Sequence, residues 1–310
     1  MIPFDPLFRH PHVQTIAAHY WPRPRSVDRF AIVRRLFETE PGISVLVESQ
    51  RPPGHAAGEI VLVHGLEGSG EAGYIDSLAG VALAAGFAAH RFHMRTCGGT
   101  ERYANTLYHA GLTSDLAAVL RVWRAEGHAP AYLVGFSLGG NVVLKLAGEL
   151  GESAAGLIRG VCGVSTPIDL AACGERLGAA ENRLYQYRFV RRMRARLCAT
   201  GRYQLSDFAG LRSIKAIDDR ITAPSFGFGD AANYYRTQSA IRYMDAIRVS
   251  TLLIQAKDDP LVPFAAFERL PANPCIHLAA TGHGGHLGFL GKRPHRFWAD
   301  EAVMEWVQAN

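Results

Sequence analysis

The feature that most constrains the fold of this chain is a series of short apolar runs, most of them followed by a stretch with helical periodicity. Residues 59–63 and 131–135 are the clearest runs, and polar side chains do not alternate with apolar ones in either. A strand that lacks this alternation is buried on both faces, as in parallel sheets that helices cover on both sides. The sequence therefore predicts an α/β fold with a mostly parallel, twisted sheet flanked by helices.

The same patterns predict the other elements of this sheet. Further strands are predicted at residues 43–48, 87–93, 157–164, 249–255 and 275–279. Helices are predicted at residues 73–85, 113–126, 138–150 and 296–308. Strands that alternate with helices in this way imply a parallel sheet with helices on both faces.

One long segment interrupts the alternation. Residues 167–247 contain no convincing buried strand, are rich in Arg, Tyr and Gly, and have the pattern of helices and loops. We therefore expect a core domain made of residues 1–166 and 248–310, with residues 167–247 inserted as a helical lid. Such an insertion would cover the carboxyl edge of the sheet, where ligands bind in open α/β sheets.

Composition excludes several other classes of protein. The chain has 310 residues, of which 48% are hydrophobic. This composition excludes an intrinsically disordered chain, a collagen-like protein and a coiled coil. The five cysteines are odd in number and form no C-x-x-C pair, which favours free thiols in a reducing compartment. The first ten residues lack the apolar region of a signal peptide, and the longest apolar run, residues 78–89, is too short to span a bilayer. We expect a soluble, cytoplasmic protein.

The chain is basic, with a net charge of +5, and 29 of its 33 basic residues are Arg. No helix-turn-helix, zinc-finger or RNP-type pattern accompanies the charge, so a nucleic-acid partner is not expected. Five arginines lie within the predicted lid: Arg188, Arg191, Arg192, Arg194 and Arg196. Apolar residues interleave with them at helical spacing. This pattern is typical of a helix whose apolar stripe packs on the core, or of a basic amphipathic helix that contacts an anionic membrane surface.

The sharpest chemical motif is G-F-S-L-G at residues 135–139, between a predicted strand and a predicted helix. The two glycines permit a tight turn that exposes the Ser137 hydroxyl at a helix N-terminus. There the N–H of Leu138 faces the reacting centre, and the helix dipole favours negative charge. The alternative, a nucleotide-binding turn, requires G-x-G-x-x-G, and here Ser137 occupies the position of the middle glycine.

A nucleophilic serine requires a base and an acid that orients the base, in the chain order Ser, acid, His in this type of fold. Asp258 and Asp259 directly follow the strand predicted at residues 249–255. We prefer Asp259, which precedes P-L-V-P, and interpret Asp258 as a turn or capping residue.

The base is predicted in G-H-G-G-H at residues 282–286, which offers His283 and His286. An H-x-x-H pair can also bind a metal, but no third ligand is apparent nearby. Sequence position alone does not distinguish the two histidines.

The loop at residues 63–70, V-H-G-L-E-G-S-G, follows the first buried strand. An H-G-x loop in this position supplies a second oxyanion-hole donor, which we assign to the N–H of Leu66 as a partner of the Leu138 N–H.

With these four elements in order, the chain resembles the α/β-hydrolase superfamily, and within it the YheT-like branch of bacterial hydrolases and eukaryotic abhydrolase-domain membrane lipases. The motifs that carry the resemblance lie at residues 10–15, 64–69, 135–141, 226–235, 256–260 and 283–289. The resemblance implies a triad of Ser137, Asp259 and His286, with His283 as a structural neighbour. The chain departs from the branch at Thr96, where the family usually has Gly, and at His10, where it usually has Asn.

The expected activity is hydrolysis of carboxylic esters through an acyl-enzyme, with no metal or organic cofactor. Candidate pocket residues are His64, Phe228, Tyr234 and Tyr235. The resemblance implies short- to medium-chain esters for bacterial members, and acylglycerols or phospholipids for the eukaryotic relatives. Two alternatives remain, an acyltransferase that uses the same triad and a non-catalytic binding protein of the same fold.

Overall fold

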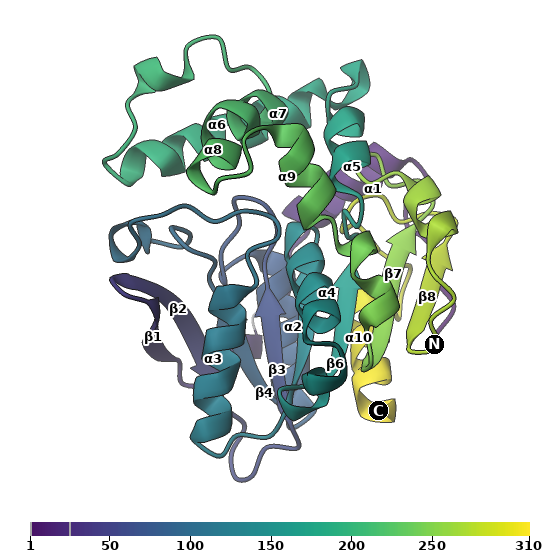
Figure 1. Cartoon of the computed structure of the whole chain (residues 1–310). Helices are drawn as coiled ribbons and strands as arrows, with labels where there is room; N and C mark the ends of the chain where they lie inside the picture. Colours follow the sequence, from purple (N-terminus) through teal and green to yellow (C-terminus); the bar gives the residue numbers. More distant parts are fainter. Residues whose placement is uncertain (1, 25) are drawn as a thin grey trace.

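The computed structural model of the chain describes residues 2–24 and 26–310. Its centre is an eight-stranded sheet of order β1-β2-β4-β3-β5-β6-β7-β8 (Figure 1). The strands are β1 (Val33–Glu40), β2 (Ile43–Gln50), β3 (Glu59–Val63), β4 (Ala88–Phe92), β5 (Ala131–Phe136), β6 (Ile158–Val164), β7 (Ser250–Ala256) and β8 (Ile276–Thr281). β2 pairs antiparallel with both β1 and β4, and every pairing from β4 across to β8 is parallel. The predicted α/β fold with a mostly parallel sheet is confirmed.

Helices cover both faces of this sheet. The α-helices are α1 (Pro11–Tyr20), α2 (Gly73–Ala84), α3 (Ser114–Ala125), α4 (Leu138–Leu150), α5 (Leu170–Leu177), α6 (Arg183–Ala199), α7 (Ile214–Ile217), α8 (Ala223–Ser225), α9 (Ala231–Gln238) and α10 (Trp298–Ala309). Apolar side chains of α3 and α4 pack on one face, and those of α2 and α10 pack on the other.

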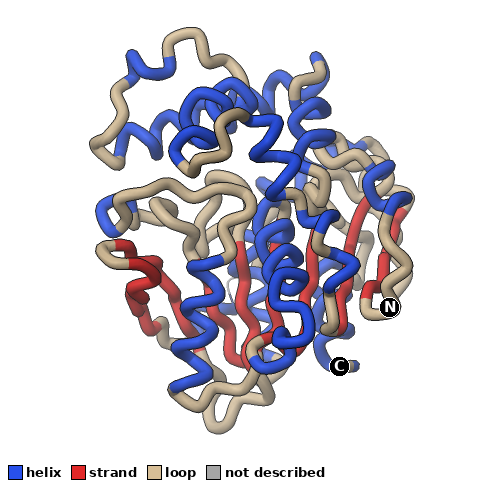
Figure 2. Tube along the Cα trace, viewed as in Figure 1, coloured by secondary structure: helices blue, strands red, loops and turns tan. Residues whose placement is uncertain are grey.

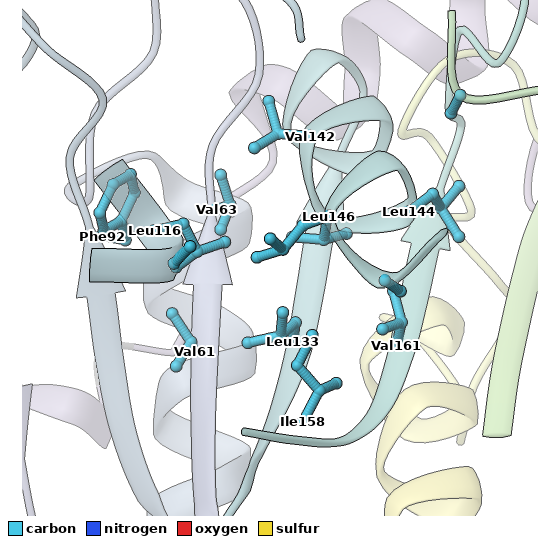
Figure 3. Close-up of a cluster of buried hydrophobic side chains, with 14 of the residues drawn as sticks. Val61, Val63, Phe92, Leu116, Leu133, Val142, Leu144, Leu146, Ile158 and Val161 are labelled. Atoms are coloured by element: carbon cyan, nitrogen blue, oxygen red, sulfur yellow. The ribbon is translucent and has the colours of Figure 1, made fainter. Parts of the chain in front are cut away.

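The strand β3 illustrates how both faces become core. Val61 and Val63 join the cluster under α3 and α4, whereas Ile60 and Leu62 join the cluster under α2 and α10. Successive side chains of a strand point to opposite faces of the sheet. An unbroken apolar run therefore contributes buried side chains to the core on both faces. Figure 3 shows the α4 side of this core, where Val61 and Leu133 lie below Val142 and Leu146 in the view.

Residues 167–247 form helices and loops above the carboxyl ends of the strands, and the structure, which describes all of them, has no strand there (Figures 1 and 2). This segment has apolar clusters of its own, one of them between α6, α7 and the π-helical turn η6 (Asp218–Thr222). Among the described residues, no helix is both long and apolar enough to cross a membrane.

Two elements were not predicted, β1 and α1. In β1 only Phe37 is buried, because the strand lies at the edge of the sheet with charged residues along it, so it lacks the apolar run of the inner strands. In α1 only Gln14 and Ala18 are buried, and the helix has a weak apolar face. The boundaries of β2 to β8 and of α2, α3, α4 and α10 agree with the prediction to within two residues.

Candidate active site

Ser137 occupies the turn between β5 and α4 with φ 51° and ψ −122°, a conformation that residues with a Cβ rarely adopt. The flanking glycines make the turn possible. A Cβ at Gly135 would lie 2.3 Å from the carbonyl oxygen of Gly139, and a Cβ at Gly139 would lie 2.3 Å from that of Val63. The backbone of this turn is therefore packed directly against the end of β3.

Three side chains form a continuous hydrogen-bonded chain at this turn. The Nε2 of His286 lies 2.9 Å from the Oγ of Ser137, and its Nδ1 lies 2.9 Å from an Oδ of Asp259. A carboxylate only accepts, so Nδ1 of His286 carries the proton and Nε2 of the neutral ring accepts from the Ser137 hydroxyl. The carboxylate of Asp259 is fully buried and also accepts from the N–H groups of Leu261 and Val262 at 2.8 and 3.0 Å.

The two neighbouring candidates form a separate pair. The Nδ1 of His283 lies 3.2 Å from Asp258, which also accepts from the N–H of Gly285 at 2.9 Å. The His283 side chain is 41% exposed, and within the described chain it forms no hydrogen bond with Ser137. These residues hold the histidine loop to the loop that follows β7.

Sequence analysis missed the role of α1 in supporting this loop. Thr15 Oγ1 accepts from the N–H of His286 at 2.8 Å, and the fully buried Gln14 donates to the carbonyl of Leu290 at 2.8 Å. A Cβ at Gly285 would lie 2.5 Å from Thr15 Oγ1, so helix and loop are in close contact. Both residues belong to the H-P-H-V-Q-T motif at residues 10–15, which indicates the family but not its position beside the histidine loop.

Leu66 and Leu138 both border the cavity beside Ser137. Leu138 is the first residue of α4, so its N–H has no acceptor within the helix. Leu66 lies in the loop after β3, where the N–H of Gly65 donates to the Tyr74 hydroxyl at 3.0 Å. The loop turns at Glu67, which has a φ of 54°.

The cavity above Ser137 has a volume of about 120 Å³ and lies between the core and residues 167–247. Its lining is mainly apolar and includes Leu170, Leu177, Phe189, Met193, Ile214 and Leu261. Of the four predicted pocket residues, Tyr234 and Tyr235 line it. Phe228 does not, because it stacks against Tyr234 at a centroid distance of 5.3 Å.

His64 also lies outside the cavity lining, which corrects its predicted role. It is fully buried, with Nδ1 at 2.8 Å from the carbonyl of Gly65 and Nε2 at 3.2 Å from the N–H of Met94. Burial lowers the pKa of His64 to about 3, so the ring is neutral and can donate to one of these groups and accept from the other. His64 thus connects the loops after β3 and β4.

The cavity lining also includes a histidine and a carboxyl group that were not predicted, His109 and Asp218. Burial lowers the pKa of His109 to about 3, and its Nδ1 accepts from the N–H of Gly111 at 3.2 Å. Burial raises the pKa of Asp218 to about 6, although the carboxyl group accepts from the Tyr235 hydroxyl at 2.7 Å. Their place in the site depends on how the helices fold over the sheet, which local sequence does not reveal.

The predicted basic helix is α6, and its arginines do not form one solvated face. Val190, Met193 and Leu197 are buried, as expected of a stripe that packs inward. Arg196 is also buried, and Arg194 donates to the backbone carbonyl of Leu211. Among the described residues, no group of three His, Cys, Asp or Glu side chains could hold a metal ion.

Comparisons with known proteins identify the family of the chain. The family model described as alpha/beta hydrolase family matches residues 60–300. The chain is 34% identical over 261 residues to the Escherichia coli (strain K12) protein YheT, which is named as an esterase, and the match covers 80% of this chain and 76% of that protein.

A more distant relative and a solved structure extend the comparison. The monoacylglycerol lipase of Saccharomyces cerevisiae is 26% identical over 266 residues, which cover 80% of this chain but only 58% of that protein. The Pyrococcus furiosus esterase Pf2001 superimposes with a TM-score of 0.61 at 17% identity, over 93% of this chain and 98% of that one. At this identity the structural match supports the fold alone.

Proposed function

The chain belongs to the alpha/beta hydrolase family and is a carboxylic ester hydrolase. From this premise we propose that Ser137 is its nucleophile and that Asp259 and His286 complete the catalytic triad. The observation that carries the proposal is the continuous chain of hydrogen bonds from Ser137 through His286 to the buried Asp259, at the base of an apolar cavity. The order of these residues along the chain is that of the family.

In the proposed reaction, the Ser137 Oγ attacks the ester carbonyl while His286 Nε2 accepts its proton. His286 then donates that proton to the leaving alcohol, and the acyl group stays on Ser137. Asp259 keeps the Nδ1 proton in place and stabilises the imidazolium. Water, activated by His286, then releases the carboxylic acid.

We assign the oxyanion hole to the N–H groups of Leu66 and Leu138. The N-terminus of α4 favours the negative charge that develops on the carbonyl oxygen, and the N–H of Leu138, the first residue of this helix, has no acceptor within it. Removing one such donor typically lowers kcat by about 10²- to 10³-fold.

The cavity favours small acyl groups in the conformation described. An apolar cavity of about 150 Å³ binds benzene, so one of about 120 Å³ suits a short acyl chain. We propose that residues 167–247 act as a lid over a core of residues 1–166 and 248–310, and that longer chains require the lid to move. The proposed substrates are short- to medium-chain or lipid-like esters.

The test is a chain-length series of p-nitrophenyl esters with wild type and Ser137→Ala, combined with labelling by a fluorophosphonate. We expect turnover of short esters and labelling by wild type only. The absence of both reactions in wild type would refute the proposal. Product analysis with added alcohols distinguishes hydrolysis from acyl transfer by the same triad.

We also propose a contact between the outer face of α6 and anionic lipid. Arg183, Arg191 and Arg212 line a groove of about 630 Å³, beside Leu184, Tyr187 and Leu205, which are 67–75% exposed. Exposed apolar side chains next to arginines are typical of interfacial helices. Binding to phosphatidylglycerol vesicles that is lost when the three arginines become Gln would support the contact, and failure of wild type to bind would refute it.

A further inference from the structure

The residue that follows Leu66 has an unusual backbone conformation. Glu67 has a φ of 54°, in the left-handed region that favours glycine, although the chain uses glutamate there. A non-glycine residue stays in this region only when its surroundings determine it strongly. The contacts of Glu67 therefore indicate which residues fix the conformation of the loop that carries Leu66.

One set of contacts comes from Tyr108, which meets Glu67 twice. The Tyr108 hydroxyl accepts from the N–H of Glu67 at 3.0 Å and donates to its carboxylate at 3.1 Å. Both residues are buried. These bonds fix the backbone and the side chain of Glu67 at the same time.

The stronger set comes from α6, on the inserted segment, 129 residues further along the chain. The Nε of Arg196 lies 3.0 and 2.9 Å from the two carboxylate oxygens of Glu67, and its Nη2 lies 2.9 Å from one of them. The side chains of Arg196 and Glu67 are 7% and 3% exposed. Two charges this deeply buried depend on each other, since either one alone would be left without compensation.

Arg196 also contacts a third loop. Its Nη1 donates to Thr96 Oγ1 at 2.7 Å, and its guanidinium lies 4.6 Å from the centre of the Tyr108 ring. Thr96 follows β4 and, like Glu67, has a left-handed backbone, with φ 59°. One arginine of α6 thus connects the loop after β3, which carries Leu66, to the loop after β4.

We propose that Arg196 is a positioning residue. It holds Glu67 in place, and through Glu67 it keeps the N–H of Leu66 in the geometry of the oxyanion hole. It does so only while α6 is packed on the core. The inference rests on the proposed role of Leu66. The Glu67–Arg196 pair would couple the position of the inserted helices to ester hydrolysis. Displacement of α6 would remove the ion-pair partner of Glu67, and the loop that carries Leu66 would become mobile. The oxyanion hole is then complete only in the covered state.

The experiment separates positioning from stability with a mutant cycle. Arg196→Met leaves the Glu67 charge unpaired, so we expect a melting temperature lower by about 5 °C or more. We expect kcat for a short p-nitrophenyl ester to fall by about 10- to 100-fold, with KM changed by no more than about twofold. Adding Glu67→Gln removes the unpaired charge and should restore most of the melting temperature but not kcat. Arg192→Met, an exposed arginine one turn earlier in α6, is the matched control and should change neither.

Recovery of kcat together with melting temperature in the double variant would overturn the inference, because the pair would then serve stability alone. An unchanged kcat in Arg196→Met would also overturn the inference. The proposed function would stand in that case, because the wild-type protein would still hydrolyse the ester. Amide hydrogen exchange of residues 64–70 gives a readout independent of turnover. We expect faster exchange in Arg196→Met and in the double variant than in wild type, and equal exchange would refute the proposal even if no ester were turned over.

Discussion

The two backbone donors assigned to the oxyanion hole are held in place by different parts of the molecule. Leu138 belongs to a turn that the core itself fixes, since the N–H of Ser137 donates to the carbonyl of Val164 and Gly139 packs on the end of β3. Leu66 belongs to a loop whose next residue, Glu67, is held by Arg196 of the inserted α6.

The difference divides the site into a fixed part and a part that depends on α6. The close backbone contacts of the Ser137 turn are with Val63, His64 and Val164 of the core, whereas displacement of α6 would remove the only ion-pair partner that the described chain gives to Glu67. An enzyme arranged in this way can keep its nucleophile ready while it assembles the second donor on closure, as substrate-induced closure does in other enzymes.

The largest effect is expected in the fixed part, at the histidine that contacts Ser137. His286→Ala removes the acceptor of the serine proton, and we expect kcat/KM for a p-nitrophenyl ester to fall by about 10⁴-fold or more. His283→Ala is the matched control, because His283 contacts Asp258 instead, and it should cost less than about fivefold. Steady-state kinetics measure both, and equal losses would contradict the assignment.

The second effect concerns the backbone of the Ser137 turn. Gly139→Ala would put a methyl group 2.3 and 2.5 Å from the carbonyl oxygens of Val63 and His64, so β3 or α4 must shift. We expect the free energy of unfolding to fall by about 3 kcal/mol or more, measured by urea denaturation. Gly156→Ala is the control, because a Cβ there meets nothing within 4 Å. Equal stability of the two variants would show that the turn is not held by backbone packing.

The fixed part is also the part that the sequence could predict. Ser137, Asp259 and His286 each follow an apolar strand within a few residues, so strand prediction places them at one edge of the sheet. Inner strands such as β3 and β5 are recognisable because burial on both faces leaves an unbroken apolar run, a signal that β1 lacks because only its Phe37 is buried.

The part that depends on α6 could not be predicted, for a physical reason. The Glu67–Arg196 pair joins residues 129 positions apart, and nothing in the local pattern of α6 distinguishes Arg196 from the exposed arginines beside it. The same holds for Asp218, whose burial results from the packing of η6 against α9. His64 was predicted to line the pocket because its motif borders the cavity. Its side chain instead contacts the backbone of Gly65 and Met94, in the loops after β3 and β4.

The smallest effect is expected in the inserted segment, where Asp218 makes stability depend on pH. Burial raises the pKa of Asp218 from 3.8 to about 6, with the Tyr235 hydroxyl as its hydrogen-bond partner and the charges of Glu67 and Arg196 acting in opposite directions. Between pH 4 and 6 the folded protein therefore binds a proton that the unfolded chain has lost. The free energy of unfolding then falls as pH rises through this window, by at most about 3 kcal/mol in total.

Asp218→Asn removes this titration and keeps an oxygen that can accept from Tyr235. Other carboxyl groups also titrate, but their contributions are shared by both proteins and cancel in the difference. We expect the variant to gain stability over wild type at pH 7.5 and to lose most of this advantage at pH 4.5, as measured by urea denaturation at each pH. Parallel pH profiles would mean that Asp218 stays ionised in the folded protein, so the inserted segment would hold a buried charge at the cavity. A convergent profile would instead identify a carboxyl group that takes up a proton below about pH 6 in the folded protein, as expected of an acid buried beside an apolar cavity.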